Sequence, residues 1–344
     1  MARFMKTTGK IAKKTPNRNA AAAANGWCFQ VGAGIKLMLD YVKDFSHIKM
    51  EGKSDDIEIT LGEGKKLYAQ AKSVIQIGDQ KNAGKNLNNA LKILSEDEQN
   101  GDAFKLVYIT NIVNPLSSKL VSAFQYGQVY NFSILSSVDQ TRIIDKVGND
   151  FPTDKFQLQI MHFFGEGNDK FNTIKEYIKE FLRDAIEDPS YCQRLLDDWF
   201  EMLMVNSTDK PSENKKVNLT KKQILYPVIT LVIDPPITDE EFSKVCDYED
   251  YTEITQDFRE TIYETTCDYE FIVQVLGDYL VKRKTAVDKK NYKYEFTKNE
   301  WRNYEKEFIR IVDAEKRQAL VKILILTIIT RNSKLNRIKK AVNL

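Results

Sequence analysis

Three polar residues, Asp56, Gln70 and Lys72, have the types and spacing that hydrolysis of a phosphodiester requires. Such hydrolysis needs a divalent cation on the phosphate, an activated water and a positive charge that stabilises the transition state. Mg²⁺ prefers oxygen ligands, with Mn²⁺ as the alternative cation, and the Asp56 carboxylate, the Gln70 amide oxygen and the backbone carbonyl of Ala71 can supply them. Lys72 can then orient or deprotonate the attacking water, or neutralise the developing charge.

The spacing itself is only weakly informative. One Asp, followed after thirteen residues by a Gln-x-Lys, occurs by chance in many chains. A charged face on a hairpin is also usually no more than a solvated surface. The candidate chemistry therefore depends on whether the surrounding elements bring these side chains together.

The segment around the triplet predicts a β-hairpin. Residues 56–61 alternate strictly between polar and apolar side chains, as half-buried strands do, and residues 62–65 have the composition of a turn. Residues 67–72 then read as the returning strand, on which Gln70 and Lys72 share one face. Because Asp56 begins the first strand and Lys72 ends the second, the turn brings the two side chains close.

Further elements predict an α/β domain with a mixed sheet over residues 1–165, of which 1–25 are expected to be flexible. Apolar residues at helical spacing predict a helix over 27–45. Other predicted helices are 84–94, 117–124 and 139–147, and the other predicted strands are 106–110, 130–135 and 156–164. From 166 to 344 the pattern is helical, with helices over 171–186, 191–204, 221–233, 257–282 (broken near Gly277), 299–314 and 315–338.

Composition indicates a cytoplasmic protein without a membrane span. The four cysteines show no CxxC pair, only two histidines are present, and no apolar run reaches eighteen residues.

Net charge is +2, but its distribution is uneven: residues 1–19 and 331–344 carry bases and no acid, whereas residues 234–270 carry thirteen acids and two bases. This asymmetry suggests polyanion contact at some surfaces and a protein partner at the acidic one. The alternative is that the blocks are solvated faces and frayed ends.

Four segments together resemble a known family. GWCFQ at 26–30, EGKSDDIEI at 51–59, YAQAKS at 68–73 and LVYITNIVNP at 106–115 are similar to the N-terminal double-strand-DNA endonuclease domain of bacterial anti-phage systems. One family with this domain is the nuclease effector of cyclic-oligonucleotide (CBASS) signalling, and the same domain also occurs as the nuclease subunit of Lamassu systems beside an SMC-like ATPase. The Gln-x-Lys variant also resembles Mrr-type restriction nucleases. The resemblance covers residues 26–115, about a quarter of the chain.

The resemblance implies a PD-(D/E)XK fold, a restriction-endonuclease-like mixed sheet flanked by helices. It places the metal-binding acid on Asp56, with Asp55 as the fallback, and the Gln-x-Lys pair on Gln70 and Lys72. Glu51 and Gln30 match flanking positions that hold water, metal or the helix against the site. The helical half does not resemble a cyclic-nucleotide sensor, which favours control by partner proteins.

The sequence thus predicts a Mg²⁺-dependent double-strand-DNA endonuclease of a defence system, gated by homo-oligomerisation or by partners such as an SMC-like ATPase and an accessory subunit. The alternative is a non-catalytic DNA-binding or scaffold subunit that retains the fold, and an RNA nuclease is a third reading. We expect salt-sensitive DNA binding with little sequence preference. The expected phosphate contacts are Lys13, Lys14, Lys65, Lys66, Lys81 and Lys85.

Overall fold

A computed structural model describes most of the chain. The described residues are 20–51, 55–78, 82–99, 101–117, 124–208, 218–233, 237–246, 251–258, 261–262, 265 and 269–343. Three expected DNA contacts, Lys13, Lys14 and Lys81, lie outside these ranges, as does most of the helix predicted over 117–124.

Seven strands form one mixed sheet within the described residues, in the order β5-β6-β4-β3-β2-β1-β7. The pairs β1/β2, β2/β3, β1/β7 and β5/β6 are antiparallel, whereas β3/β4 and β4/β6 are parallel. The bounds are β1 Phe45–Met50, β2 Ile57–Leu61, β3 Lys66–Lys72, β4 Ala103–Thr110, β5 Val129–Asn131, β6 Phe156–Ile160 and β7 Leu219–Thr220. The predicted mixed α/β sheet, followed by a helical C-terminal part, is confirmed.

Strand β1 is absent from the sequence prediction, in which a helix over 27–45 runs five residues past the end of the real helix at Asp40. The register between β1 and β2 shifts between Phe45 and His47, so that Phe45 and Ile48 are both buried although three residues separate them. Three-residue spacing breaks the strict alternation that marks a strand, which explains why the sequence pattern shows no strand here. The true helix, α1 (Ala20–Asp40), also begins earlier than predicted. Its first turns are the alanines of 20–24, the residues with the highest helix propensity, and part of the segment predicted as flexible is therefore helical.

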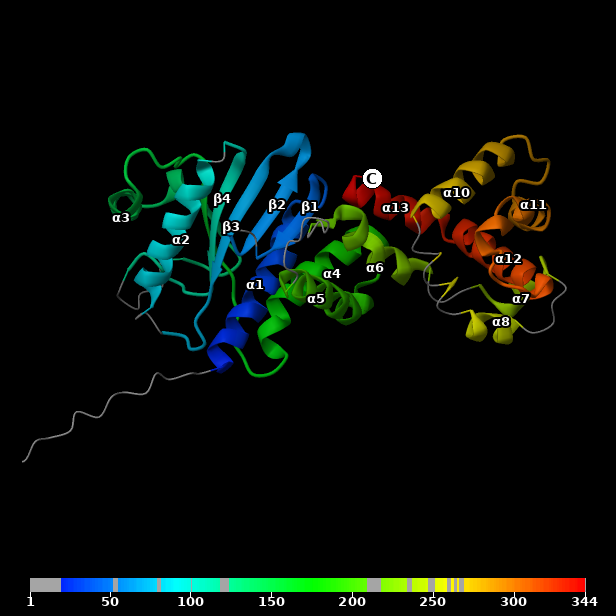
Figure 1. Ribbon diagram of the computed structural model, residues 1–344, viewed down its shortest axis with the longest axis horizontal. Helices are drawn as coiled ribbons and strands as arrows, with labels where there is room; N and C mark the ends of the chain where they lie inside the picture. Colours follow the sequence, from blue (N-terminus) through cyan, green and yellow to red (C-terminus); the bar gives the residue numbers. More distant parts are fainter. Residues whose placement is uncertain are drawn as a thin grey trace, which may run out of the picture.

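Helices cover both faces of the sheet (Figure 1). Helix α1 packs on one face against the inward side chains of β1–β4, such as Ile59 and Ala71. Helices α2 (Ala83–Glu98) and α3 (Ser137–Val147) pack on the other face, where they bury Tyr68 and Tyr108. β3 and β4 therefore carry apolar side chains toward both layers, as expected of central strands. The strand predicted over 130–135 ends at Asn131 and turns into a 3-10 segment, and the one predicted over 156–164 ends at Ile160.

A helical lobe forms the other end of the molecule (Figure 1). Its helices are α7 (Asp239–Ser243), α8 (Tyr251–Asp257), α10 (Tyr269–Arg283), α11 (Tyr292–Glu300) and α12 (Ala314–Thr330). Residues 319–329 of α12 are buried on every side, which makes this helix the centre of the lobe. The expected break near Gly277 is wrong, since α10 runs through it. The helix predicted over 299–314 is also wrong, because α11 ends at Glu300 and two 3-10 turns follow.

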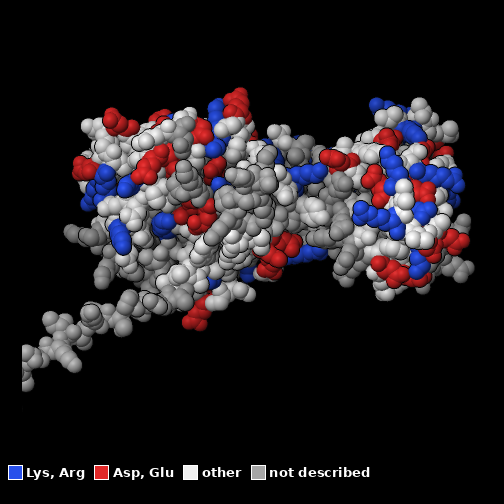
Figure 2. Space-filling model, viewed as in Figure 1, with Lys and Arg blue, Asp and Glu red and all other residues white. Residues whose placement is uncertain are grey.

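The acidic block of the sequence is in part neutralised within this lobe. Lys316 of α12 binds Glu253 and Asp257 of α8, with nitrogen–oxygen distances of 2.5 and 3.0 Å, and Lys293 binds Glu241 at 2.8 Å. Figure 2 shows acidic and basic side chains mixed over the lobe on the face in view. These described carboxylates therefore hold the lobe's own helices together.

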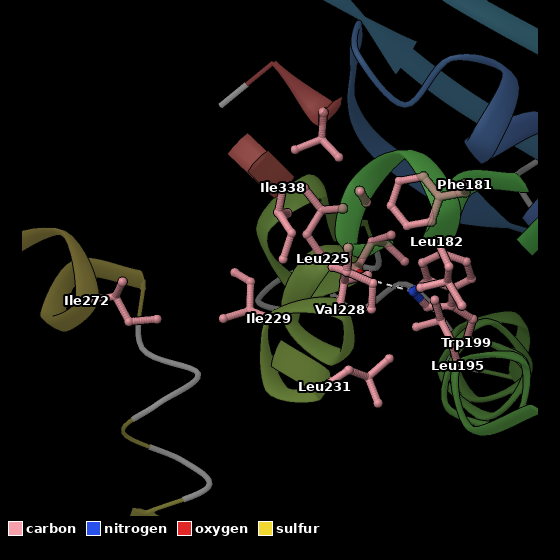
Figure 3. Packing of buried hydrophobic residues seen from close by; sticks show 14 of the residues in the cluster. Phe181, Leu182, Leu195, Trp199, Leu225, Val228, Ile229, Leu231, Ile272 and Ile338 are labelled. Carbon is pink, nitrogen blue, oxygen red and sulfur yellow. Dashed lines mark hydrogen bonds between the residues drawn. The ribbon is translucent and has the colours of Figure 1, made fainter. Parts of the chain in front are cut away.

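Three helices connect the sheet to the lobe. Helices α4 (Asn172–Ile186) and α5 (Cys192–Thr208) pack against α1, and α6 (Lys221–Ile233) packs against α5 and β1. The Trp199 indole N–H donates to the carbonyl of Ile224 at 2.7 Å (Figure 3). Helix α13 (Asn332–Val342) leaves the lobe and packs on α4 and α6, where Ile338 is buried. Elements on both sides of residue 165 thus share one hydrophobic core.

Within the part of the chain that the structure describes, no helix combines the length and the apolar character needed to cross a bilayer.

Candidate active site

An ion pair between Asp56 and Lys72 lies at the open end of the β2/β3 hairpin. Lys72 Nζ lies 3.0 Å from Oδ1 and 2.8 Å from Oδ2 of Asp56, and the backbone N–H of Ala71 donates to the same Oδ2 at 2.7 Å. The ladder between β2 and β3 pairs Ile57 with Ala69, so Asp56 falls beside the last residues of β3. The proximity that the sequence predicts for Asp56 and Lys72 is therefore present.

Gln70 and the fallback acid Asp55 form a second pair beneath the first. Gln70 is fully buried, and its amide nitrogen lies 3.4 Å from Oδ1 of Asp55, which is also buried. Both carboxylates of the Asp55–Asp56 dipeptide thus contact a residue of the Gln-x-Lys pair. Gln70 directs its amide N–H at Asp55, and the amide group also carries an oxygen of the kind that binds cations.

Glu51 completes the cluster from the end of β1. Its backbone N–H donates to the carbonyl of Asp56 at 2.9 Å, and its φ of 49° lies in the left-handed region. Burial raises the pKa of the Glu51 carboxyl and the neighbouring Asp56 raises it further, while Lys72 and a hydrogen bond from Gln30 of α1 oppose the rise. A raised pKa beside a second carboxylate is the state that a bound cation would relieve.

The donor set fits a hard divalent cation. Asp56 and Glu51 offer carboxylate oxygens, and Gln70 offers an amide oxygen. In a strand, the N–H and C=O of one residue project to the same edge, so the Ala71 carbonyl faces the same side as the N–H that binds Asp56. Among the described residues, no group of three or more His, Cys, Asp or Glu side chains is placed to hold a metal. An oxygen site that includes an amide and a carbonyl suits Mg²⁺, which keeps several waters.

The expected phosphate contacts are only partly near this cluster. Lys66 stands at the other end of β3, about 20 Å from Lys72 along the strand, and its Nζ lies 3.2 Å from carboxylate oxygens of both Glu58 and Asp102. Lys65 is beside it and pairs with Glu63. The structure does not bring these two lysines to the site. Lys85 is exposed in the first turn of α2, whose start lies near the end of β3.

Two buried residues that the sequence analysis did not single out support the site: Tyr108 in β4, and Asn111 directly after that strand. Tyr108 of β4 lies opposite Gln70 of β3 in the ladder. Burial raises the pKa of the Tyr108 hydroxyl and the charge of Asp56 raises it further, whereas a hydrogen bond with the Thr110 side chain lowers it. Asn111, also fully buried, accepts from the N–H of Val74 at 2.8 Å and donates to the Val74 carbonyl at 2.7 Å. Asn111 thus holds the chain two residues after Lys72. The sequence signal for this role is an asparagine directly after a buried strand, and such a residue is usually interpreted as the end of the strand.

Replacing Asn111 with alanine is expected to destabilise the fold by about 2–4 kcal/mol, because both polar groups of Val74 lose their partner inside the protein. Chemical denaturation measures this change directly. The matched control is Asn89→Ala on the exposed face of α2, for which we expect a change within about 0.5 kcal/mol. Equal stability of the two variants would contradict the inferred clamp.

Comparison with known proteins yields little. The sequence matches no family model, and a comparison with curated proteins finds no match. Among solved structures, the chain is similar to an Acinetobacter baumannii Cap4 SAVED/CARF-domain containing receptor with the cyclic trinucleotide 2'3'3'-cAAA, at 13% identity and a TM-score of 0.39. The similarity covers 75% of this chain and 59% of that chain, so this chain spans about three fifths of the other's length.

Proposed function

We propose that the protein is a metal-dependent double-strand-DNA endonuclease with a PD-(D/E)XK fold and a Gln-x-Lys active site. One observation carries the proposal: Asp56 and Glu51 converge with Lys72 at the end of a hairpin whose next strand, β4, runs parallel to β3. A solvated hairpin face has no need for a buried aspartate, a lysine and a second carboxylate with a raised pKa in one place.

Each residue then has a defined task. Asp56 and Glu51, with the Gln70 amide oxygen and the Ala71 carbonyl, would hold the cation, which supplies Lewis acidity to the scissile phosphate. Lys72 is within hydrogen-bond distance of Asp56 and can turn its ammonium group toward the attacking water or the phosphate oxygens. Gln30 holds the Glu51 carboxylate toward α1. Tyr108 stays protonated beneath Asp56, because its raised pKa disfavours the phenolate.

The biological setting proposed is anti-phage or anti-plasmid defence, and it rests on the resemblance of the segments within 26–115. A nuclease that cuts host DNA must be held inactive until it is needed. We therefore propose gating by oligomerisation or by a partner complex such as an SMC-like ATPase with its accessory subunit. The experiment that tests the catalytic proposal is incubation of the purified protein with supercoiled plasmid, with Mg²⁺ and with a chelator. Cleavage only with the metal supports it, and metal-independent cleavage, or cleavage of RNA alone, contradicts it.

Cleavage of both DNA strands is expected to require two copies of the chain. A duplex has two scissile strands, and the described residues of one chain provide one Asp56–Glu51–Lys72 cluster. The rate of linear-product formation should then rise with more than the first power of protein concentration. Light scattering on the same samples should show dimers or larger assemblies where the rate is high. A strictly monomeric protein that linearises plasmid at a rate proportional to its concentration would exclude this gating.

A further inference from the structure

A groove of about 440 Å³ opens at the end of β3 next to the candidate active site. It lies between the first turns of α1, the loop that follows Lys72 and the first turn of α2, and all three segments meet at the same end of the sheet (Figure 1). We call it the amide groove, because its polar side chains are mostly amides. The residues that matter for its chemistry are Asn25, Ser73, Ile75, Gln76, Asn82 and Asn86.

The side chains of the amide groove are suited to base edges more than to phosphates. Each Asn or Gln side chain carries both a hydrogen-bond donor and an acceptor, whereas a phosphate oxygen only accepts. None of the described residues that line the groove is acidic or basic. In the major groove of DNA, Asn and Gln bind the N6 and N7 positions of adenine in pairs of hydrogen bonds. Ile75, whose exposed fraction is 48%, offers the apolar contact that the thymine methyl group takes.

The position of the groove ties it to the candidate chemistry. Ser73, one of its lining residues, directly follows Lys72. On α1, Asn25 precedes Gln30 by five residues, which is about 7.5 Å along the helix axis. Since successive base pairs of DNA are about 3.4 Å apart, a duplex bound at the candidate site would pass the groove within a few base pairs of its scissile phosphate.

We propose that the amide groove reads an A·T base pair from the major-groove side, a few base pairs from the cut. The proposal rests on the proposed nuclease function and deepens it. It also departs from the expectation of little sequence preference, which depended on lysines as the main DNA contacts. Lys65 and Lys66 are paired with carboxylates away from the site, whereas the amides of the groove lie beside it.

The test is sequencing of the DNA ends that the full-length protein produces from a library with randomised sequence. We expect A or T to be enriched about 10-fold at one fixed offset from the cut, the discrimination expected of a good bidentate contact. Gln76→Ala and Asn86→Ala should each lower this enrichment at least about 3-fold. The control is Asn88→Ala, because Asn88 is exposed on α2 and is not among the lining residues of the groove.

Two variants guard against a folding artefact. Asn86 is half-buried, whereas Gln76 is exposed in a loop. We therefore expect Gln76→Ala to leave the fold intact even if Asn86→Ala does not. Cleavage by the wild type with no enrichment at any offset overturns the base-reading proposal and leaves the nuclease proposal standing. Enrichment that survives in Gln76→Ala and in a folded Asn86→Ala also overturns it. Absence of any DNA cleavage by the wild type at concentrations at which it assembles overturns both.

Discussion

Replacement of Lys72 with alanine is expected to lower the rate of plasmid cleavage by about 100- to 1000-fold, the loss typical of removing one preorganised cation or donor from a transition state. The variant should remain folded. Asp56 keeps its hydrogen bond from the Ala71 N–H, so losing the ammonium partner should cost about 1–3 kcal/mol, a part of the stability of an ordinary domain. Gel assays of cleavage and thermal denaturation measure the two effects separately.

The matched control is Lys66→Ala at the opposite end of the same strand. Lys66 also binds carboxylates, so the two variants lose comparable ion pairs, but only one pair lies in the candidate site. We expect Lys66→Ala to cleave within about 2-fold of the wild type, since an ion pair away from the scissile phosphate does not act on the transition state. Similar losses in both variants would mean that Lys72 acts through stability alone.

Replacement of Asp56 with alanine should lower the affinity for Mn²⁺ or Mg²⁺ by at least about 100-fold, because even groups that only orient metal ligands contribute 10- to 100-fold. Cleavage should fall with it. Titration calorimetry in the absence of DNA measures the metal affinity, so this result does not depend on activity.

The control for this substitution is Glu58→Ala. Glu58 lies two residues after Asp56, within β2, and binds Lys66 instead of Lys72. If Glu58→Ala loses the metal as completely as Asp56→Ala does, the cation site is elsewhere on the sheet. If neither variant changes a measurable affinity, Asp56 is a structural partner of Lys72 and the metal assignment fails.

The hairpin and its ion pair could be predicted because they depend on local order. Strict alternation over 56–61, turn residues at 62–65 and the position of Lys72 at the far end leave only one way to close the hairpin. The same holds for the strand at 106–110 and for the predominantly helical second half.

The parts of the fold and of the candidate site that the sequence does not predict depend on contacts between distant parts of the chain. Glu51 reaches the site only because β1 forms, and the bulge near Phe45 interrupts the alternation by which a sequence pattern would reveal β1. The Asn111 clamp joins residues 37 positions apart and follows no periodicity. In the lobe, residues 301–308 have helical composition but form 3-10 turns, and Trp301 and Phe308 are buried there beside α12. Tertiary packing overrides the local signal at this point.

We propose above all that the cluster of Asp56, Glu51 and Lys72 hydrolyses DNA with a divalent cation. The most direct measurement is the rate at which the purified wild-type protein linearises supercoiled plasmid in Mg²⁺, beside Lys72→Ala and Lys66→Ala at the same concentration. At concentrations at which the protein assembles, we expect metal-dependent linearisation by the wild type and by Lys66→Ala, and almost none by Lys72→Ala. Equal cleavage by all three proteins, or cleavage that persists after the metal is chelated, would contradict it.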